Sequence, residues 1–495
     1  MQFWKLYKVP LLLTFVSLFL YWLFAYQLIR TEYTKLIVLY SLLWLVFIVL
    51  LKYAKQNFKF LTAIAFLSRA IFILAIPSLS QDFYRFIWDG RLILEGINPY
   101  LYTPESFIQS GKLPIAEATA LYEGMGQLNG SHFSNYPPIN QLCFAIAGLF
   151  SGHSILGSAI VFRLLIIAAD FGTFFFGKRL LKALNIPVKN IFWYLLNPFI
   201  IIELTGNLHF EGVMIFFLVW SLYLLHTGKW KWAAVVFALS ISVKLIPLLF
   251  LPLLFKYFKK SRTTSSPSSH SFQSTSLLSD QNNNEILKQV QNDNKTNITP
   301  LSRMHVDIKK LIAFYSIVGI TTALLFIPFF STEFVSNYAA TVGLWFQNFE
   351  FNASIYYLAR EIGYWFRGYN EIAVIGKILP LLVFGFVMVL AFVKRKVDTK
   401  QLITHMLLAF TCYLFLSTTV HPWYLATLLF LSCFTNYKFA LVWSFVIILS
   451  YLAYINLNTA DKSEQLWIIA IEYIVVYSVF IWEVFIKKAN SNELA

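Results

Sequence analysis

Long apolar segments separated by short basic segments constrain this chain more than any other feature. Apolar runs recur from residue 9 to residue 486, and most have the length of about 20 residues that spans a bilayer as an α-helix. Only 13% of the 495 residues are charged, whereas soluble domains average about 25%. This excludes a soluble enzyme and a disordered chain. We therefore predict an all-α polytopic membrane protein, with 1–495 forming a single integral-membrane domain.

The apolar runs predict about 14 transmembrane helices. Two of them, 231–244 and 246–258, have only about half the usual length. The predicted spans are 9–29, 35–51, 59–79, 155–177, 190–205, 210–227, 231–244, 246–258, 309–330, 372–393, 401–418, 421–435, 438–455 and 466–486.

The net charge of +15 comes from basic residues that lie between the apolar segments rather than in one patch. This distribution follows the positive-inside rule and does not indicate nucleic-acid binding. Basic runs such as 178–189 and 394–400 then face the cytoplasm, and both termini lie there too. The apolar segment 137–150 is too short for a full span, and we expect it to be a re-entrant or interfacial helix on the outer side.

Three longer connections remain between the spans. Residues 80–136 form a first extracytoplasmic loop with several acidic residues, and residues 331–371 form a second one that is rich in aromatic residues. The stretch 259–306 is a Ser/Thr/Asn/Gln tract on the cytoplasmic side. Its composition cannot build an apolar core, so we expect a disordered insertion without a catalytic role.

The most informative stretch is SQDFYRFIWDGRLILEGINPY, residues 80–100. If it is helical, Gly96 and Pro99 end the helix. Asp82 and Asp89 are seven residues apart and share a helix face with Arg85. A carboxylate held there beside arginines could deprotonate an incoming hydroxyl, and a solvated loop with local ion pairs is the plainer alternative.

A second polar group lies in NPFIIIELTGNLHFEG, residues 197–212, at the turn between two predicted spans. Ionisable residues at membrane depth are costly and therefore tend to be functional. We interpret them as a second acidic site that contacts the acceptor, and an ordinary polar turn is the alternative. These residues are Glu203, Asn207, His209 and Glu211.

Basic and aromatic residues at two further span ends complete the predicted site. Lys244, between the two half-length segments, could pair with a phosphate or could be a snorkelling lysine at an interface. His421 offers a hydrogen-bond donor, and Tyr424 beside it is either a site residue or part of an aromatic belt. Arg85 and Arg91 are further candidates for binding the donor phosphate.

Within one predicted span, Arg163 and Asp170 lie seven residues apart, so that they could neutralise each other inside the bundle. We assign no residue as a metal ligand and expect no cofactor. Dependence on a divalent metal is left open. The three cysteines are scattered in apolar segments and indicate neither disulfides nor a metal cluster.

Residues 80–100, residues 197–212, Lys244 and the pair His421 and Tyr424 are four polar groups that are all expected on the outer face of the membrane. Carboxylates, a lysine, a histidine and aromatics together suit a sugar linked to a phosphate, because aromatics stack on sugars and cations hold a phosphate leaving group. Nucleotide sugars are absent outside a bacterial plasma membrane, so the donor must be borne by the membrane. A transporter or flippase of lipid-linked glycans and a non-catalytic scaffold are the alternatives, although acids gathered in one long loop favour an enzyme.

The motifs DFYRFIWDGRLILEGINPY, NYPPINQL, GNLHFEG, SVKLIP, FEFNASIYYL and HPWY occur in this order across about residues 60–430. This order resembles the GT-C glycosyltransferases, and most of all the bacterial polyprenyl-phosphate-mannose-dependent mannosyltransferases. The sequence departs from that pattern at Phe210, where the family usually has Asn or Asp, and through the insertion 259–306.

The resemblance implies inverting transfer of a hexose, most simply mannose, from a polyprenyl-phosphate sugar to a glycan or glycolipid acceptor on the extracytoplasmic side. It also implies that an acidic residue of the first outer loop is the general base, which corresponds to Asp82. Asp89 is the alternative base, or it orients the neighbouring arginines.

Overall fold

The computed structural model describes residues 2–54, 57–258, 307–347, 349–393, 397–456 and 464–487. The predicted insertion 259–306 lies outside these residues. Within the described ranges every regular element is a helix, and one isolated parallel bridge joins Phe351 to Thr419. The predicted all-α class is therefore confirmed.

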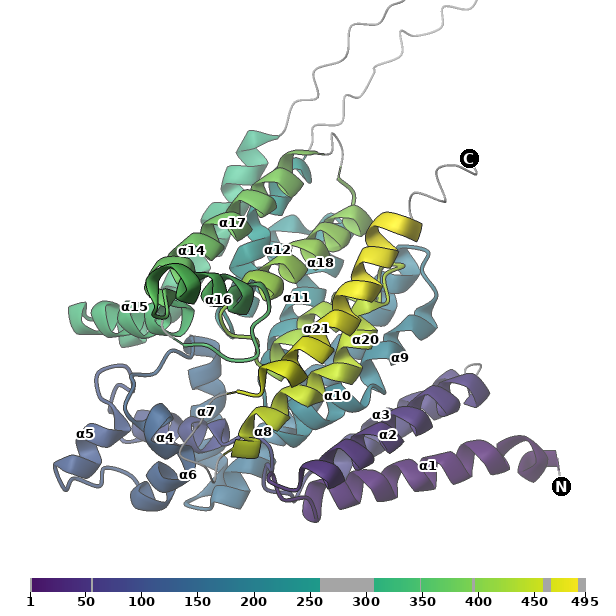
Figure 1. Ribbon diagram of the computed structural model, residues 1–495, viewed down its shortest axis with the longest axis horizontal. Coiled ribbons are helices and arrows are strands. Elements are labelled where there is room, and N and C mark those ends of the chain that lie inside the picture. The colour runs from purple at the N-terminus through teal and green to yellow at the C-terminus, as the bar shows by residue number, and fades with distance from the viewer. Residues whose placement is uncertain are drawn as a thin grey trace, which may run out of the picture.

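The N-terminal half contains long helices and several short ones that change direction (Figure 1). In chain order its helices are α1 (Gln2–Tyr26), α2 (Tyr33–Ala54), α3 (Phe58–Ala70), α4 (Asp82–Leu94), α5 (Pro104–Gln109), α6 (Ala118–Gly130), α7 (Pro138–Ser151), α8 (Ile155–Ala183), η1 (Val188–Ile191), α9 (Phe192–Leu195), α10 (Pro198–Ile200), η2 (Ile201–Gly206), α11 (Glu211–His226), α12 (Trp230–Ile241) and η3 (Ile246–Lys256).

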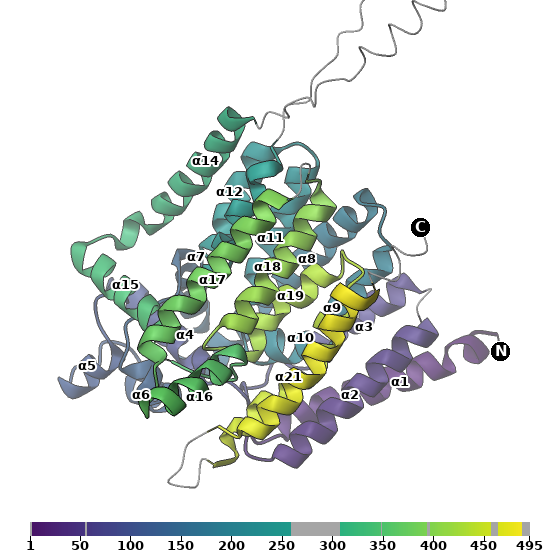
Figure 2. The same ribbon diagram turned by 45° about the horizontal axis from the view of Figure 1, so that its top comes forward.

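The C-terminal half packs its helices against the first half, and α4 to α7 gather with α15 and α16 at one end of the molecule (Figures 1 and 2). Its helices are α14 (Ile308–Phe326), η4 (Ile327–Phe329), α15 (Thr332–Gln347), α16 (Ile355–Arg367), α17 (Ile372–Val393), α18 (Thr399–Leu416), η5 (Pro422–Tyr424), α19 (Leu425–Ser432), α20 (Phe439–Val446), η6 (Ile447–Asn456), α21 (Leu466–Ile481) and η7 (Trp482–Ile486).

Several helices are long and apolar enough to cross a membrane. Six single helices in the described residues meet this condition, and a seventh span results if the bent pair Pro198–Gly206 and Glu211–His226 is counted as one. Other apolar helices are shorter, among them α7, α12 and η3. The structure thus supports a polytopic membrane protein, whereas the predicted number of 14 spans is not confirmed.

The predicted span 59–79 is wrong as a single helix, because α3 ends at Ala70. The chain then passes through a turn and extended backbone before α4 begins at Asp82. Pro77 lies in this stretch and has no backbone N–H to continue a helix.

The predicted ion pair between Arg163 and Asp170 is also wrong. Asp170 pairs instead with Arg69, with 2.6 Å between Oδ2 and Nε, and both side chains are fully buried. The Arg163 guanidinium donates to the backbone carbonyls of Ile73, Thr205 and Gly206. It thereby satisfies carbonyls at two places where helices break, which is what a non-helical backbone at membrane depth requires.

The predicted helix in residues 80–100 is confirmed as α4, which ends at Leu94, just before Gly96 with its positive φ of 72°. The helix packs closely on α7, the short apolar helix expected over 137–150. At Gly90 the backbones come so near that a Cβ would lie 2.2 Å from the Phe144 carbonyl oxygen. This crossing fixes the position of α4 at the site.

Candidate active site

A cavity of about 520 Å³ lies where the start of α4, the α6–α7 connection, the start of η3 and the 417–424 segment meet. Five residues predicted for the site contribute to its wall: Asp82, Arg85, Lys244, His421 and Tyr424. They come from chain segments more than 300 residues apart. None of the other predicted residues lines the cavity.

Asp82 is the first residue of α4 and is half-buried at the cavity wall. A helix N-terminus favours a negative charge at this position. Its Oδ1 accepts a hydrogen bond of 3.2 Å from Nδ2 of Asn129. Burial raises the pKa of the Asp82 carboxyl above its ordinary value, and the charge of Lys244 together with the Asn129 hydrogen bond opposes that rise. The group is thus an acidic side chain held half-buried at the cavity wall.

Asp89 is fully buried, and its carboxylate already has several donors. It accepts from Arg85 Nε at 2.8 Å, from Gln141 at 3.1 Å and from the Ser134 hydroxyl. The side chain therefore has the geometry of a structural anchor, and it does not reach the cavity.

Arg85 transmits that anchoring to the cavity wall. Its Nη1 donates to the backbone carbonyls of Asn129, at 2.6 Å, and His132, at 2.8 Å. Asn129 in turn donates to Asp82, so Asp89 and Arg85 hold the group that orients the cavity carboxylate. Arg85 Nη2 is buried and has no hydrogen-bond partner within the described part of the chain.

Arg91 lies on the same helix, but its contacts are with residues outside the cavity. Its guanidinium donates to the carbonyls of Ala116 and His153 and contacts the Glu117 carboxylate at 3.1 Å. These contacts tie the loop after α5 to the α7–α8 connection, and Arg91 does not line the cavity.

Lys244 follows α12, and its ammonium group reaches the cavity while remaining paired with a carboxylate. Its Nζ lies 3.1 Å from Glu211 Oε1 and 5.3 Å from the centre of the Tyr136 ring. Glu211 is the first residue of α11 and is fully buried. The pair places a cation at the cavity wall, and its positive charge acts on Asp82.

Four rings form a continuous stack beside the cavity. His209 stacks on Trp423 with 3.7 Å between ring centres, and Trp423 stacks on His421 with 4.5 Å. His421 then faces Phe351 at 5.1 Å, and Tyr424 meets it edge-on at 5.4 Å. His209 is buried behind Trp423, so it supports the stack rather than the cavity surface.

Glu203 and Asn207 lie deeper, at the broken helix. Asn207 donates to Glu203 at 3.3 Å, and the Tyr451 hydroxyl donates to Glu203 at 2.8 Å. Asn207 also accepts from the backbone N–H of Leu79 at 3.4 Å, two residues after Pro77. Tyr451 and Leu79 line the cavity, whereas Glu203 and Asn207 do not.

The atypical Phe210 fills an aromatic cluster. Its ring centre lies 5.7 Å from that of Phe86, 5.3 Å from that of Phe144 and 5.6 Å from that of Phe162, each edge to face. An Asn or Asp there would bury a polar group among these rings, so a phenylalanine suits this chain.

Several cavity residues were not predicted from the sequence. Tyr136 lies within the NYPPINQL motif, which could have indicated it, whereas Asn129 and Tyr451 carry no local signal. Phe349 and Phe351 stand in the FEFNASIYYL motif. Among the described residues, no group of three or more His, Cys, Asp or Glu side chains is arranged to hold a metal ion.

A second, mostly apolar cavity of about 320 Å³ shares walls with the first. It lies between η3, α17 and α18, where exposed apolar side chains cover much of α17. The residues common to both cavities are Leu248, Leu249, Tyr413 and Ser417.

Comparison with known proteins gives two matches. A family model described as alpha-(1->6)-mannopyranosyltransferase, N-terminal domain, matches residues 9–258. The alpha-(1->6)-mannopyranosyltransferase A of Mycobacterium tuberculosis is 23% identical over 183 residues, which cover 37% of this chain and 34% of that protein. The similarity thus spans about a third of the curated relative's length. No solved structure matches the chain.

Proposed function

The chain belongs to the alpha-(1->6)-mannopyranosyltransferase family, and we propose that it transfers mannose from a polyprenyl-phosphate donor to a glycan or glycolipid acceptor. One observation carries this proposal. A cavity with a carboxylate and a cation on its wall shares its boundary with a second, mostly apolar cavity beside helix α17, whose apolar side chains are exposed. A donor with a charged head and an apolar tail needs both surfaces.

The carboxylate and the cation have distinct roles in the proposed reaction. Asp82 accepts the proton of the acceptor hydroxyl as that oxygen forms a bond to the sugar C1. The bond from C1 to the phosphate oxygen breaks, and polyprenyl phosphate leaves with the electron pair from the opposite face. The configuration at C1 is therefore inverted.

The leaving phosphate needs positive charge and hydrogen-bond donors. Lys244 supplies the charge, and Arg85 and His421 also line the cavity. Tyr424 and Trp423 supply ring faces for the sugar or the isoprenoid chain. Glu211 keeps Lys244 in place. Glu203 and Asn207 support Tyr451 on the acceptor side, and His209 supports Trp423.

The proposed location follows from the donor. The cavity lies on the extracytoplasmic side of a bacterial plasma membrane, so that 80–136 and 331–371 face outward and the basic segments and both termini face the cytoplasm. The helices that are long and apolar enough to span the bilayer cross it in this arrangement, and the shorter apolar helices enter it.

A direct assay tests the function. The purified protein in lipid vesicles is given synthetic polyprenyl-phosphate mannose, glucose or arabinose, or a nucleotide-linked mannose, each with a mannose-containing acceptor. We expect transfer from polyprenyl-phosphate mannose only. Transfer from the nucleotide sugar, or movement of the lipid-linked sugar across the membrane without transfer, would contradict the proposal, and the second result would support the flippase alternative.

A further inference from the structure

Helix α16 presents an apolar stripe that no described part of the chain covers. Its exposed apolar side chains recur every three or four residues, and Trp365 and Phe366 are 85% and 82% exposed. With 3.6 residues per turn, these side chains share one face of the helix, and Arg360 lies on the opposite face. The stripe consists of Leu358, Ile362, Trp365 and Phe366 on the helix, together with the exposed Tyr369 just after its end at Arg367.

The neighbouring helix indicates what covers this stripe. Helix α17, Ile372–Val393, begins five residues after α16 ends, and it is one of the helices long and apolar enough to cross a membrane. Figure 2 shows α16 lying crosswise at the end of α17. A helix with one apolar face that contains Trp, Phe and Tyr is typical of the membrane–water interface. Lipid that surrounds α17 would therefore also reach the stripe.

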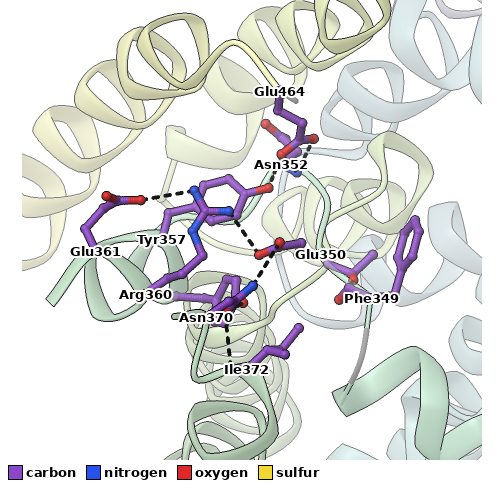
Figure 3. A network of polar contacts seen from close by, with 11 residues as sticks. Phe349, Glu350, Asn352, Tyr357, Arg360, Glu361, Asn370, Ile372 and Glu464 are labelled. Atoms are coloured by element: carbon purple, nitrogen blue, oxygen red, sulfur yellow. Dashed lines mark hydrogen bonds and ion pairs between the residues drawn. The ribbon is translucent and has the colours of Figure 1, made fainter. Parts of the chain in front are cut away.

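The opposite face of α16 carries a polar network (Figure 3). Arg360 Nη1 lies 3.1 Å from Glu350 Oε2, and Asn370 donates to the other oxygen of Glu350 at 3.3 Å. The Tyr357 hydroxyl donates to Glu464, and the same carboxylate accepts the backbone N–H of Asn352 at 3.0 Å. Helix α16 thus holds the segment 349–352 from one side.

The alternating side chains of this segment point to the cavity. Phe349 and Phe351 line the cavity and face the His421 ring at 6.0 Å and 5.1 Å, whereas Glu350 and Asn352 join the network. The backbone of Phe351 is paired with the 418–420 segment, donating to Thr418 and accepting from Val420. The segment is therefore one aromatic wall of the cavity, held between α16 and the 418–420 segment.

We propose that α16 rests in the membrane–water interface through its apolar stripe and that Arg360 transmits this position to the Phe349–Phe351 wall. Contact with lipid then determines the position of Phe349 and Phe351 relative to the bound donor. The inference rests on the proposed function only in identifying the cavity occupant as a lipid-linked sugar. Arg360 is a positioning residue in this account, because it acts through Glu350.

The depth of α16 is measured first, and this measurement needs no substrate. A nitroxide label is placed on Trp365→Cys and, as the matched control, on Arg367→Cys on the opposite, polar face, in a chain whose three cysteines are replaced and which stays active. In vesicles we expect the label at 365 to be relaxed by oxygen and shielded from a water-soluble nickel chelate, and the reverse at 367. Equal exposure of both labels to the chelate would overturn the lipid contact.

The link to the cavity is measured next, with the same vesicles. Replacing Trp365 and Phe366 together by Ser should raise the donor KM about fivefold and leave kcat nearly unchanged, because a loosened wall weakens donor binding uniformly. Arg360→Met should do the same, Arg360→Lys should restore part of the affinity, and combining Arg360→Met with the Ser pair should add little.

A control pair removes the same kind of lipid-facing surface elsewhere. Leu12→Ser with Phe15→Ser on α1 takes away two exposed apolar side chains far from the network, and the donor KM should stay within twofold of wild type. An unchanged donor KM in the α16 pair, or fully additive effects with Arg360→Met, would overturn the transmission. A protein that transfers no mannose at all would refute the proposed function instead and leave the depth result standing.

Discussion

Asp82 and Asp89 are carboxylates of one helix, yet their surroundings give them different chemistry. Asp89 is closed in by Arg85, Ser134 and Gln141, so that a hydroxyl from outside cannot approach it. Asp82 has one side-chain donor, Asn129, and is open to the cavity. The spacing in the sequence left both residues open as the base. The difference in their surroundings favours Asp82.

The pKa of Asp82 leads to a prediction on pH dependence. Burial raises this pKa, and the base works only when ionised, so the rate should fall as the pH drops through a value above the ordinary aspartate pKa of 3.8. The positive charge of Lys244 lowers the same pKa. We therefore expect Lys244→Gln to move the acid limb of the kcat/KM profile to higher pH.

The control for this profile is Lys112→Gln, an exposed lysine of the α5–α6 connection, which should leave the acid limb where it is. If the acid limb does not move in Lys244→Gln, or moves to lower pH, then the charge of Lys244 does not lower the pKa of the catalytic base, and the assignment is contradicted.

The types of residue at the site could be predicted from the sequence, but the side chains that they contact could not. Acidic, basic and aromatic residues at span ends were expected on one face, and Asp82, Lys244 and His421 do line the same cavity. The pairing of Lys244 with Glu211 and that of Asp170 with Arg69 depend on how helices pack across 33 and 101 residues of chain. Spacing within one segment carries no information on such contacts.

At the scale of the elements, the crossing of α4 and α7 positions the proposed base. Gly90 has no side chain, and this absence lets the two helices approach until Phe144 touches its backbone. The approach brings Gln141 and Ser134 within reach of Asp89, and through Arg85 it fixes Asn129 beside Asp82.

Gly90→Ala tests this crossing. The new methyl group would lie 2.2 Å from a backbone atom that cannot rotate away, so we expect a loss of stability of about 1–3 kcal/mol and a lower rate of transfer. Gly319→Ala on α14 is the control, because the Cβ added there would point into open space. Thermal unfolding in detergent compares the two. A Gly90→Ala variant as stable as Gly319→Ala would show that the helices do not pack as described.

The apolar runs were sufficient to locate most helices, because a membrane requires continuous backbone hydrogen bonding in each span. They could not reveal where a helix breaks inside the apolar region. The predicted span 59–79 ends at Ala70, and the pair Pro198–Gly206 and Glu211–His226 bends by 113°. Both breaks are stabilised by Arg163, whose role depends on carbonyls from two distant segments.

At the scale of the whole molecule, the proposed topology places the cavity and the basic segments on opposite sides of the membrane. In cysteine-free protein in intact cells, Lys112→Cys in the 80–136 loop should react with a membrane-impermeant maleimide. Thr275→Cys in the 259–306 tract should react only after the cells are opened, because the Lys/Arg distribution places that tract inside. Protection at 112 together with labelling at 275 would invert the proposed topology.

The central claim is that Asp82 is the base of a mannosyl transfer. The most direct measurement is the kcat for transfer from polyprenyl-phosphate mannose by Asp82→Asn and Asp89→Asn, each with its thermal unfolding midpoint. General-base assistance is worth about 10²–10⁴-fold, so Asp82→Asn should lose that much in kcat while it unfolds like wild type and still binds donor. Asp89→Asn should instead lower the unfolding midpoint, because Arg85 then lacks its buried counter-charge. Near-normal turnover in Asp82→Asn would contradict the account.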